Sequence, residues 1–300
     1  MDLHTTIAGI TLQNPLILAS GIMDEDAGSM NRILDNGAAA VVTKSIGLTP
    51  RMGHKNPTFV ELDHGILNAM GLPNPGINEY IKELKEIKKQ SQIVIGSIFG
   101  STENEFKELA TAMSPYVNAL ELNLSCPHAE GYGLEIGQNP SYVKNITKTV
   151  VNTVSIPIFV KLSAQVNDIV DIAKNAEAAG ANGIVAINTL KAMSIDIELQ
   201  QPILGNKTGG YSGEAIKPIG IRAVYELHKH LCIPIIGVGG ISTGKDVIEY
   251  MMAGATAIQI GTAVYSKGID VFEKINLEIK KWMNDHKIKQ LKKIIGVAHQ

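Results

Sequence analysis

The chain has 300 residues, of which 45% are hydrophobic and 19% are charged, and its formal net charge at pH 7 is −2. This composition excludes an intrinsically disordered chain, and it lacks the basic excess of proteins that bind nucleic acids or membrane surfaces. The first residues show no basic segment followed by an apolar run, and no stretch approaches about 18 uninterrupted apolar residues, so we expect neither a signal peptide nor a transmembrane helix.

Eight short apolar runs recur along the chain. In order they are PLILAS (15–20), AAVVTKS (39–45), IVIGSIF (93–99), ALELNLS (119–125), PIFVKLS (157–163), GIVAINT (183–189), PIIGVGG (234–240) and AIQIGT (257–262). Strands that are buried on both faces are apolar throughout, whereas half-buried strands alternate apolar with polar residues. The runs therefore predict strands of a parallel sheet that is covered on both faces.

Segments with helical periodicity lie between these runs. Residues 77–90 and 167–180 have apolar side chains every three or four positions opposite a charged face, and Gly180 and Gly254 stand where helices are expected to end. Repeated strand–helix units predict an α/β fold, a single (β/α)8 TIM barrel over residues 1–300. An open doubly wound sheet would need a dinucleotide-binding fingerprint, which the sequence lacks.

Two segments are too long to be simple connections. Residues 46–76 and 126–140 each follow a predicted strand at its carboxyl end. TIM barrels build their active sites at that face, so we expect these insertions to form a lid or a floor for a substrate. The lysine-rich stretch 280–296 has the pattern of a solvated helix face, with a partner-binding surface as the alternative.

Polar residues end several of the predicted strands. They are Lys44, Ser45, Asn123, Cys126, Lys161, Asn188 and Thr189. Each alone is compatible with a solvated strand end. Because the carboxyl ends of barrel strands converge on one point, the set together predicts an active site.

Glycines mark the ends of the last two strands. Gly239 and Gly240 end one, and Gly261 precedes Thr262 at the end of the other. Glycines here let backbone N–H groups approach a phosphate, which many TIM barrels bind after their seventh and eighth strands. Gly213 is placed to approach the same ligand from the side. Tight strand–helix turns are the alternative explanation.

The chain has two cysteines, Cys126 and Cys232. This number is too small for a disulfide framework or a structural metal cluster, so we expect no metal site and a reducing, cytoplasmic setting. Cys126 lies just past a strand end in NLSCP, where a thiolate could act as a general base. Cys232 has no such context, and an inert cysteine is the ordinary interpretation.

Two lysines lie within otherwise apolar runs. Burying the ammonium of Lys44 or Lys161 is costly unless an anion compensates it. An anionic cofactor and a substrate carboxylate are suitable anions. An ion pair between Lys161 and Glu121 on the neighbouring predicted strand is the structural alternative.

The sequence resembles the dihydroorotate dehydrogenases over almost its whole length. The motifs that carry the resemblance are ASG (19–21), TKS (43–45), NAMGLPNPG (68–76), NLSCP (123–127), KLS (161–163), INT (187–189), GGYSG (209–213), GVGG (237–240) and IGTA (260–263). They occur in the order seen in that family. The cysteine in NLSCP is typical of its soluble class 1, because the membrane-associated class 2 has serine there.

The resemblance implies a set of site residues. FMN contacts are implied for Ser20, Lys44, Ser45, Asn123, Lys161, Ile187, Gly213, Gly239, Gly240, Gly261 and Thr262. Orotate contacts are implied for Lys44, Asn68, Ala69, Met70, Gly71, Leu72, Asn123, Asn188 and Thr189. Asparagine amides suit the alternating N–H and C=O edge of a pyrimidine, and Lys44 suits its carboxylate.

The implied mechanism is the oxidation of dihydroorotate to orotate in pyrimidine biosynthesis. Cys126 would remove a proton from C5 while a hydride leaves C6 for N5 of FMN. Lys161 would stabilise the negative charge on the reduced flavin, and the loop 126–140 would close over the substrate.

Within class 1 the pattern is closer to type 1B than to the self-sufficient, fumarate-using homodimers of type 1A. The resemblance implies a homodimer that joins an electron-transfer subunit with FAD and a [2Fe–2S] cluster, with NAD as the final acceptor. With two cysteines, this chain cannot ligate such a cluster itself.

Some positions depart from the family pattern. Ser97 stands where an asparagine usually contacts FMN, Ala192 replaces a common glycine, and His128 replaces an asparagine after the cysteine. Two other functions remain open: an FMN enzyme acting on another dihydropyrimidine, and a phosphate-binding barrel without a flavin that performs isomerase or lyase chemistry. The second would leave Cys126 and Lys161 without a role.

Overall fold

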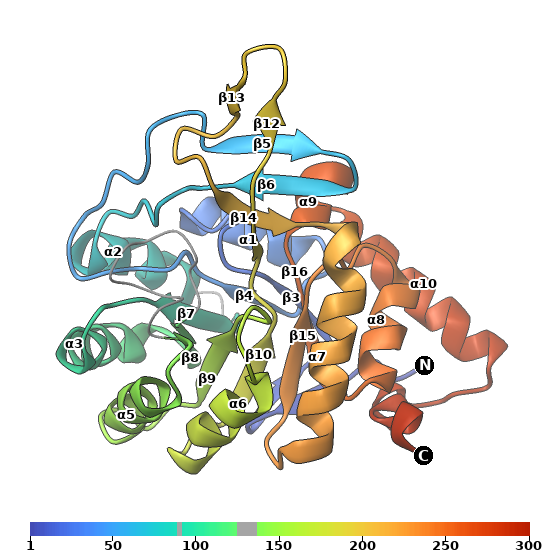
Figure 1. Ribbon diagram of the computed structural model, residues 1–300. Coiled ribbons are helices and arrows are strands. Elements are labelled where there is room, and N and C mark those ends of the chain that lie inside the picture. The colour runs from blue at the N-terminus through green and yellow to red at the C-terminus, as the bar shows by residue number, and fades with distance from the viewer. Residues whose placement is uncertain (89–91, 125–136) are drawn as a thin grey trace.

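Eight parallel strands form a closed barrel in the computed structural model, which describes residues 1–88, 92–124 and 137–300 (Figure 1). The barrel strands are β3 (Leu16–Leu18), β4 (Ala40–Val42), β7 (Val94–Ile98), β8 (Ala119–Asn123), β9 (Ile158–Leu162), β10 (Gly183–Ala186), β15 (Ile235–Val238) and β16 (Ala255–Ile260). Each pairs with its neighbours in chain order, and β16 closes the ring against β3. Every apolar run predicted as a strand supplies one of them, so the predicted TIM barrel is confirmed.

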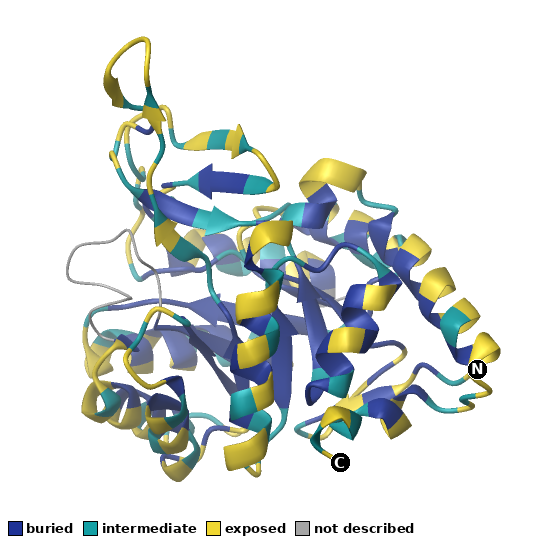
Figure 2. Cartoon of the chain, turned by 45° about the vertical axis from the view of Figure 1, so that its right-hand side comes forward, coloured by how far each residue is buried: buried dark blue, intermediate teal, exposed yellow. Residues whose placement is uncertain are grey.

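Helices surround the barrel on the outside (Figure 1). They are α1 (Ala27–Asp35), α2 (Ile77–Lys88), α3 (Glu103–Met113), α5 (Pro140–Val151), α6 (Ile169–Ala178), α7 (Lys217–His230), α8 (Gly244–Met252), α9 (Thr262–Lys267) and α10 (Val271–Asp285). Figure 2 shows their outer faces exposed and their inner faces buried against the strands. No helix in the described part of the chain is long and apolar enough to cross a membrane.

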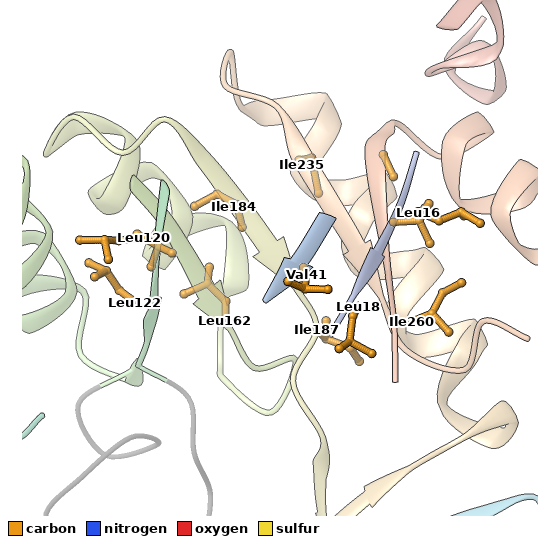
Figure 3. Close-up of a cluster of buried hydrophobic side chains, with 14 of the residues drawn as sticks. Leu16, Leu18, Val41, Leu120, Leu122, Leu162, Ile184, Ile187, Ile235 and Ile260 are labelled. Atoms are coloured by element: carbon orange, nitrogen blue, oxygen red, sulfur yellow. The ribbon is translucent and has the colours of Figure 1, made fainter. Parts of the chain in front are cut away.

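The strands are buried on both faces, which explains their largely apolar sequences. Leu16 and Leu18 belong to the large core between strands and helices, whereas Ile17 between them belongs to a second core inside the barrel. Figure 3 shows the first core, with side chains contributed by barrel strands around the ring. Apolar side chains are therefore needed at consecutive positions of each strand.

A hairpin closes the amino-terminal end of the barrel. It consists of β1 (Thr5–Ile7) and β2 (Ile10–Leu12). Ile7 and Leu12 join the core inside the barrel, and the Thr5 hydroxyl donates to the carbonyl of Thr256 near the start of β16 at 2.9 Å. Apolar side chains therefore close this end of the barrel.

A second, antiparallel sheet covers the carboxyl-terminal end of the barrel (Figure 1). Its strands, in spatial order, are β11 (Leu190–Ala192), β14 (Gly209–Ser212), β6 (Gly65–Asn68) and β5 (Phe59–Leu62). It joins the predicted insertion 46–76 to a segment that lies more than a hundred residues later. A small hairpin, β12 (Ile195–Asp196) with β13 (Gln201–Pro202), projects beyond it. The sequence predicted the insertion but not this sheet.

Two predicted helix ends are confirmed and one predicted helix is wrong. Gly180 and Gly254 follow the ends of α6 and α8 with φ of +94° and +118°, a backbone conformation that favours glycine. The stretch 280–296 is not a continuous solvated helix, because α10 ends at Asp285. Leu291 is buried after it and donates its N–H to the Asp2 carbonyl, which ties this segment to the amino terminus.

Short 3-10 helices complete the structure. They are η1 (Ser114–Tyr116), η2 (Glu214–Ile216), η3 (Leu291–Ile294) and η4 (Val297–His299). Of these, η2 follows β14 and leads into α7, so it carries the chain from the second sheet back to the barrel.

Candidate active site

A cavity of about 480 Å³ lies between the carboxyl-terminal ends of the barrel strands and the second sheet. Among the residues predicted from the sequence, those that line it are Ser20, Lys44, Ser45, Asn68, Met70, Gly71, Leu72, Asn123, Lys161, Ile187, Asn188, Thr189, Gly213, Gly239, Gly240, Gly261 and Thr262. They come from both ends of the chain and from both sheets. The fold therefore brings nearly all of the predicted site residues to one place.

Three residues considered in the sequence are placed differently. Ala69 is fully buried beside the cavity, and its N–H donates to the Thr58 carbonyl at 2.8 Å. Ser97 is fully buried below the lining residues and contacts the site through Ser45. Cys126, His128 and the predicted loop 126–140 up to residue 136 lie outside the described residues.

A hydrogen-bonded group of small polar side chains forms one part of the cavity wall. The Ser45 hydroxyl lies 2.8 Å from that of Ser97 and 3.3 Å from that of Ser20, and it accepts from the Asn123 amide at 3.0 Å. The Asn188 amide in turn reaches the Asn123 oxygen at 3.5 Å. These contacts fix the orientation of two amides whose donors and acceptors suit a polar, planar ligand.

Asn188 is held at the cavity although its strand ends early. We predicted a strand over 183–189, whereas β10 ends at Ala186. The next two residues keep barrel hydrogen bonds, from the N–H of Ile187 to Val238 at 2.8 Å and from the N–H of Asn188 to Leu162 at 2.9 Å. The backbone therefore stays in register with its neighbours until it leaves for β11.

Lys161 takes part in a buried group of charged and polar side chains. Its ammonium lies 3.2 Å from Glu121 Oε1 and donates to Gln259 Oε1 at 3.2 Å. The Gln259 amide donates to the other Glu121 oxygen at 2.6 Å. The ion pair weighed as a structural alternative is thus present, and Lys161 lines the cavity as well. We had not predicted Gln259, although an uncharged polar residue inside the apolar run AIQIGT is a signal for it.

Lys44 lies beside two acidic residues. Its ammonium contacts Glu25 Oε1 at 3.0 Å, but the Glu25 side chain is 71% exposed, so this ion pair contributes little to the stability of the fold. Asp24 is 1% exposed, and its Oδ2 accepts the N–H of Gly21 at 2.5 Å while Oδ1 has no hydrogen-bond partner in the described part of the structure. Burial raises the Asp24 pKa to about 6, against the lowering effects of the Gly21 N–H and of Lys44.

The raised pKa of Asp24 makes stability depend on pH. Below pH 3.8, the ordinary pKa of an aspartate, Asp24 is protonated in both the folded and the unfolded chain, so its ionisation does not lower the free energy of unfolding. From there to about pH 6 only the unfolded chain ionises, so the free energy of unfolding falls by about 3 kcal/mol as pH rises. We expect Asp24→Asn to remove this fall in the free energy of unfolding. Urea unfolding of wild type and Asp24→Asn at pH 4.5 and 7.5 measures the fall, with Glu25→Gln, a change at an exposed carboxylate, as control. If the free energy of unfolding changed with pH equally in wild type and Asp24→Asn, Asp24 would not be its source.

A group of glycines forms another part of the cavity wall. Gly213, Gly239 and Gly240 have φ of +112°, +127° and +69°. A β-carbon on Gly240 would lie 2.8 Å from the Gly213 carbonyl oxygen and from the Lys217 nitrogen. The segment after β15 can therefore approach the segment between β14 and α7 this closely only with glycine at position 240. Among the residues that the structure describes, the atom nearest to a β-carbon on Gly261 belongs to Ala19, at 3.5 Å, and both residues line the cavity. A side chain at position 261 would therefore extend into the cavity.

The second sheet adds lining residues that sequence reasoning did not anticipate. Phe59 and Glu61 on β5 face Tyr265 on α9, with the two rings 5.1 Å apart at their centroids and the tyrosine hydroxyl 3.4 Å from Glu61. These contacts join the second sheet to helix α9, which follows barrel strand β16. No local motif marks them, because they depend on a sheet whose strands are distant in sequence.

Comparisons with known proteins identify the family to which the chain is similar. Residues 2–283 match a family model described as dihydroorotate dehydrogenase. Relatives that carry the name dihydroorotate dehydrogenase B (NAD(+)), catalytic subunit, occur in Methanocaldococcus jannaschii, at 52% identity over 99% of this chain and 98% of the relative, and in Pyrococcus abyssi, at 49% identity over 99% of both chains. The relative of that name in Thermoplasma acidophilum is 49% identical over 99% of both chains.

Proposed function

The chain belongs to the dihydroorotate dehydrogenase family, and we propose that it oxidises dihydroorotate to orotate in the cavity at the carboxyl-terminal ends of its barrel strands. The family and the B type indicated by the sequence motifs are confirmed. The observation that carries the proposal is the convergence of Lys44, Asn68, Asn123, Lys161 and Asn188 on one cavity. This reaction belongs to pyrimidine biosynthesis.

The family implies a flavin, and we propose FMN. The cavity has the size of a cofactor site, Gly261 leaves room for a ligand, and Lys161 offers a cation to the electron-rich edge of the ring system. The phosphate would lie against Gly239, Gly240, Gly261 and Thr262. The ring system would lie against Ser20, Lys44, Ser45, Asn123, Lys161, Ile187 and Gly213, all of which line the cavity. When bound, FMN supplies the two-electron acceptor.

The remaining polar lining residues suit the substrate. Asn68, Asn123 and Asn188 present amides to the N–H and C=O groups of a pyrimidine, and Thr189 lies next to them. Lys44 offers a charge to the substrate carboxylate. The segment Asn68–Leu72 would form one side of this subsite, with Met70, Gly71 and Leu72 at the cavity and Ala69 behind it.

We propose Cys126 as the general base that removes the C5 proton of dihydroorotate. It follows β8 by three positions and is one of the two cysteines of the chain. The other, Cys232, is exposed and does not line the cavity. Loop 126–140 would exclude water from the bound substrate.

The printed name of the relatives, a catalytic subunit, implies a partner subunit. We propose that this chain forms a homodimer and joins an electron-transfer subunit with FAD and a [2Fe–2S] cluster, in a heterotetramer that passes electrons to NAD in the cytoplasm. A [2Fe–2S] cluster of the ferredoxin type is held by four cysteine thiolates, and this chain has two cysteines in all.

The visible spectrum of the purified chain, before and after anaerobic addition of dihydroorotate, tests the proposed function. We expect a flavin absorbance near 450 nm (roughly the range of oxidised flavins) that bleaches on addition of dihydroorotate. A flavin band that ignores dihydroorotate but responds to dihydrouracil would move the assignment to another dihydropyrimidine. A colourless chain that cannot be reconstituted with FMN would contradict the proposed function. It would favour the alternative of a phosphate-binding barrel that performs isomerase or lyase chemistry without a flavin.

Substitution of Gly261 separates ligand binding from folding. We expect Gly261→Ala to leave the free energy of unfolding of the FMN-free protein within about 0.5 kcal/mol of wild type. Its FMN affinity should fall about tenfold or more, because the β-carbon would occupy cavity space. Gly240→Ala is the matched comparison, since its β-carbon meets backbone and should cost about 1–3 kcal/mol without ligand. Calorimetric FMN titration measures the affinities, and undiminished binding by Gly261→Ala would place the phosphate elsewhere.

A further inference from the structure

Glu121, Lys161 and Gln259 form a closed ring of contacts inside the barrel. Lys161 Nζ lies 3.2 Å from both Glu121 Oε1 and Gln259 Oε1, and Gln259 Nε2 lies 2.6 Å from Glu121 Oε2. Glu121 and Lys161 are on the neighbouring strands β8 and β9, whereas Gln259 is on β16, four places from β8 in the ring of eight. The strands β8 and β16 thus lie on opposite sides of the barrel (Figure 1), and the contact between Glu121 and Gln259 spans its interior.

The three side chains differ in their access to the cavity. Lys161 and Gln259 line it, whereas Glu121 is fully buried and does not. Both carboxylate oxygens of Glu121 are occupied by the other two residues. An ammonium carries three N–H donors, and this ring uses two of them. A ligand in the cavity thus meets the cation first, with the carboxylate directly behind it.

This arrangement limits the positive charge that a ligand experiences. In a poorly solvated interior, charges act over several ångströms with little screening, so the Glu121 carboxylate offsets part of the Lys161 field at the cavity. The flavin carries more negative charge when reduced than when oxidised. Any cation beside it raises its reduction potential, and any anion lowers it.

We propose that Glu121 is a positioning residue that holds the Lys161 ammonium at the cavity wall and lowers the reduction potential of the flavin bound there, with Gln259 fixing the carboxylate from across the barrel. The inference rests on the proposed function, since it requires a flavin in this cavity. Stability alone does not explain the ion pair, because a buried ion pair seldom stabilises a fold more than apolar side chains of similar volume do. A role toward a bound flavin does explain it. A low potential suits onward transfer to NAD, which is a weak oxidant and is named for the relatives.

The reduction potential of the FMN-loaded chain tests this inference, measured at pH 6.5 by equilibration with reference dyes. In Glu121→Gln the ratio of affinities for reduced over oxidised FMN should rise about tenfold, which is about 30 mV for a two-electron couple. Glu121→Asp retains the charge but withdraws it from Lys161 by one methylene, so it should give a smaller rise. Gln259→Leu removes the two hydrogen bonds that Gln259 makes to Glu121 and Lys161 without changing the net charge, so the rise in its potential should be smaller than in Glu121→Gln.

The outcomes distinguish this inference from the proposed function. Equal potentials in wild type and Glu121→Gln, with FMN bound in both, would overturn the charge role and leave the function intact. If Glu121→Gln does not fold, an unchanged potential in Glu121→Asp overturns it equally. A rise in Gln259→Leu as large as in Glu121→Gln would assign the effect to packing. A chain that binds no FMN would instead overturn the proposed function.

Discussion

Lys161→Met is expected to impair both folding and catalysis, for two separable reasons. The methionine leaves the Glu121 carboxylate buried without its cation, which should lower the free energy of unfolding by about 3–5 kcal/mol. It also removes the charge that faces the cavity. The rate of flavin reduction by dihydroorotate should fall about 100-fold or more, the usual effect of losing one electrostatic contact to a developing charge.

The double variant Lys161→Met/Glu121→Gln separates these effects. It replaces the ion pair by two uncharged side chains of similar size, so most of the lost stability should return. The rate should not recover, because the cation at the cavity is still missing. Urea unfolding without ligand and stopped-flow anaerobic flavin reduction are the two measurements. Recovery of both stability and rate in the double variant would show that Lys161 serves the fold alone.

The barrel could be predicted from sequence because the signal for each strand is local. A strand that packs against helices on one side and against the barrel interior on the other is apolar at every position, as in PLILAS around Leu16–Leu18. The second sheet has no such signal. Its strands are short, and β14 at Gly209–Ser212 contains two glycines and pairs with β6, far away in the chain.

The site was predicted to the extent that it consists of strand ends and a recognisable set of motifs. Lys44, Asn123 and Lys161 follow from polar residues at the ends of apolar runs. Gln259 and Asp24 did not follow, because their importance lies in what surrounds them. Gln259 meets Glu121 from the opposite side of the barrel, and Asp24 is a carboxylate in a loop that only tertiary packing buries.

The two ends of the barrel differ in the chemistry of their buried side chains. Ile7 and Leu12 close one end with apolar contacts, whereas the other end holds a buried ion pair and hydrogen-bonded amide side chains and is covered by the second, antiparallel sheet. Buried polar groups are costly unless they are paired. Their concentration at one end is consistent with selection for binding and chemistry there, while the rest of the interior is packed for stability.

Cys126→Ala is expected to slow flavin reduction by dihydroorotate about 10²- to 10⁴-fold at pH 7, because no base remains to take the C5 proton. Cys126→Ser should retain a weak base, since a hydroxyl ionises at far higher pH than a thiol, and its rate should keep rising with pH where the wild-type rate levels off. Cys232→Ser is the matched control: it alters the exposed cysteine and should leave the rate unchanged. In that background, orotate should also protect the remaining thiol from alkylation. A Cys126→Ala variant that reduces flavin at the wild-type rate would require a different base, and the pH profile of that variant would then give its pKa.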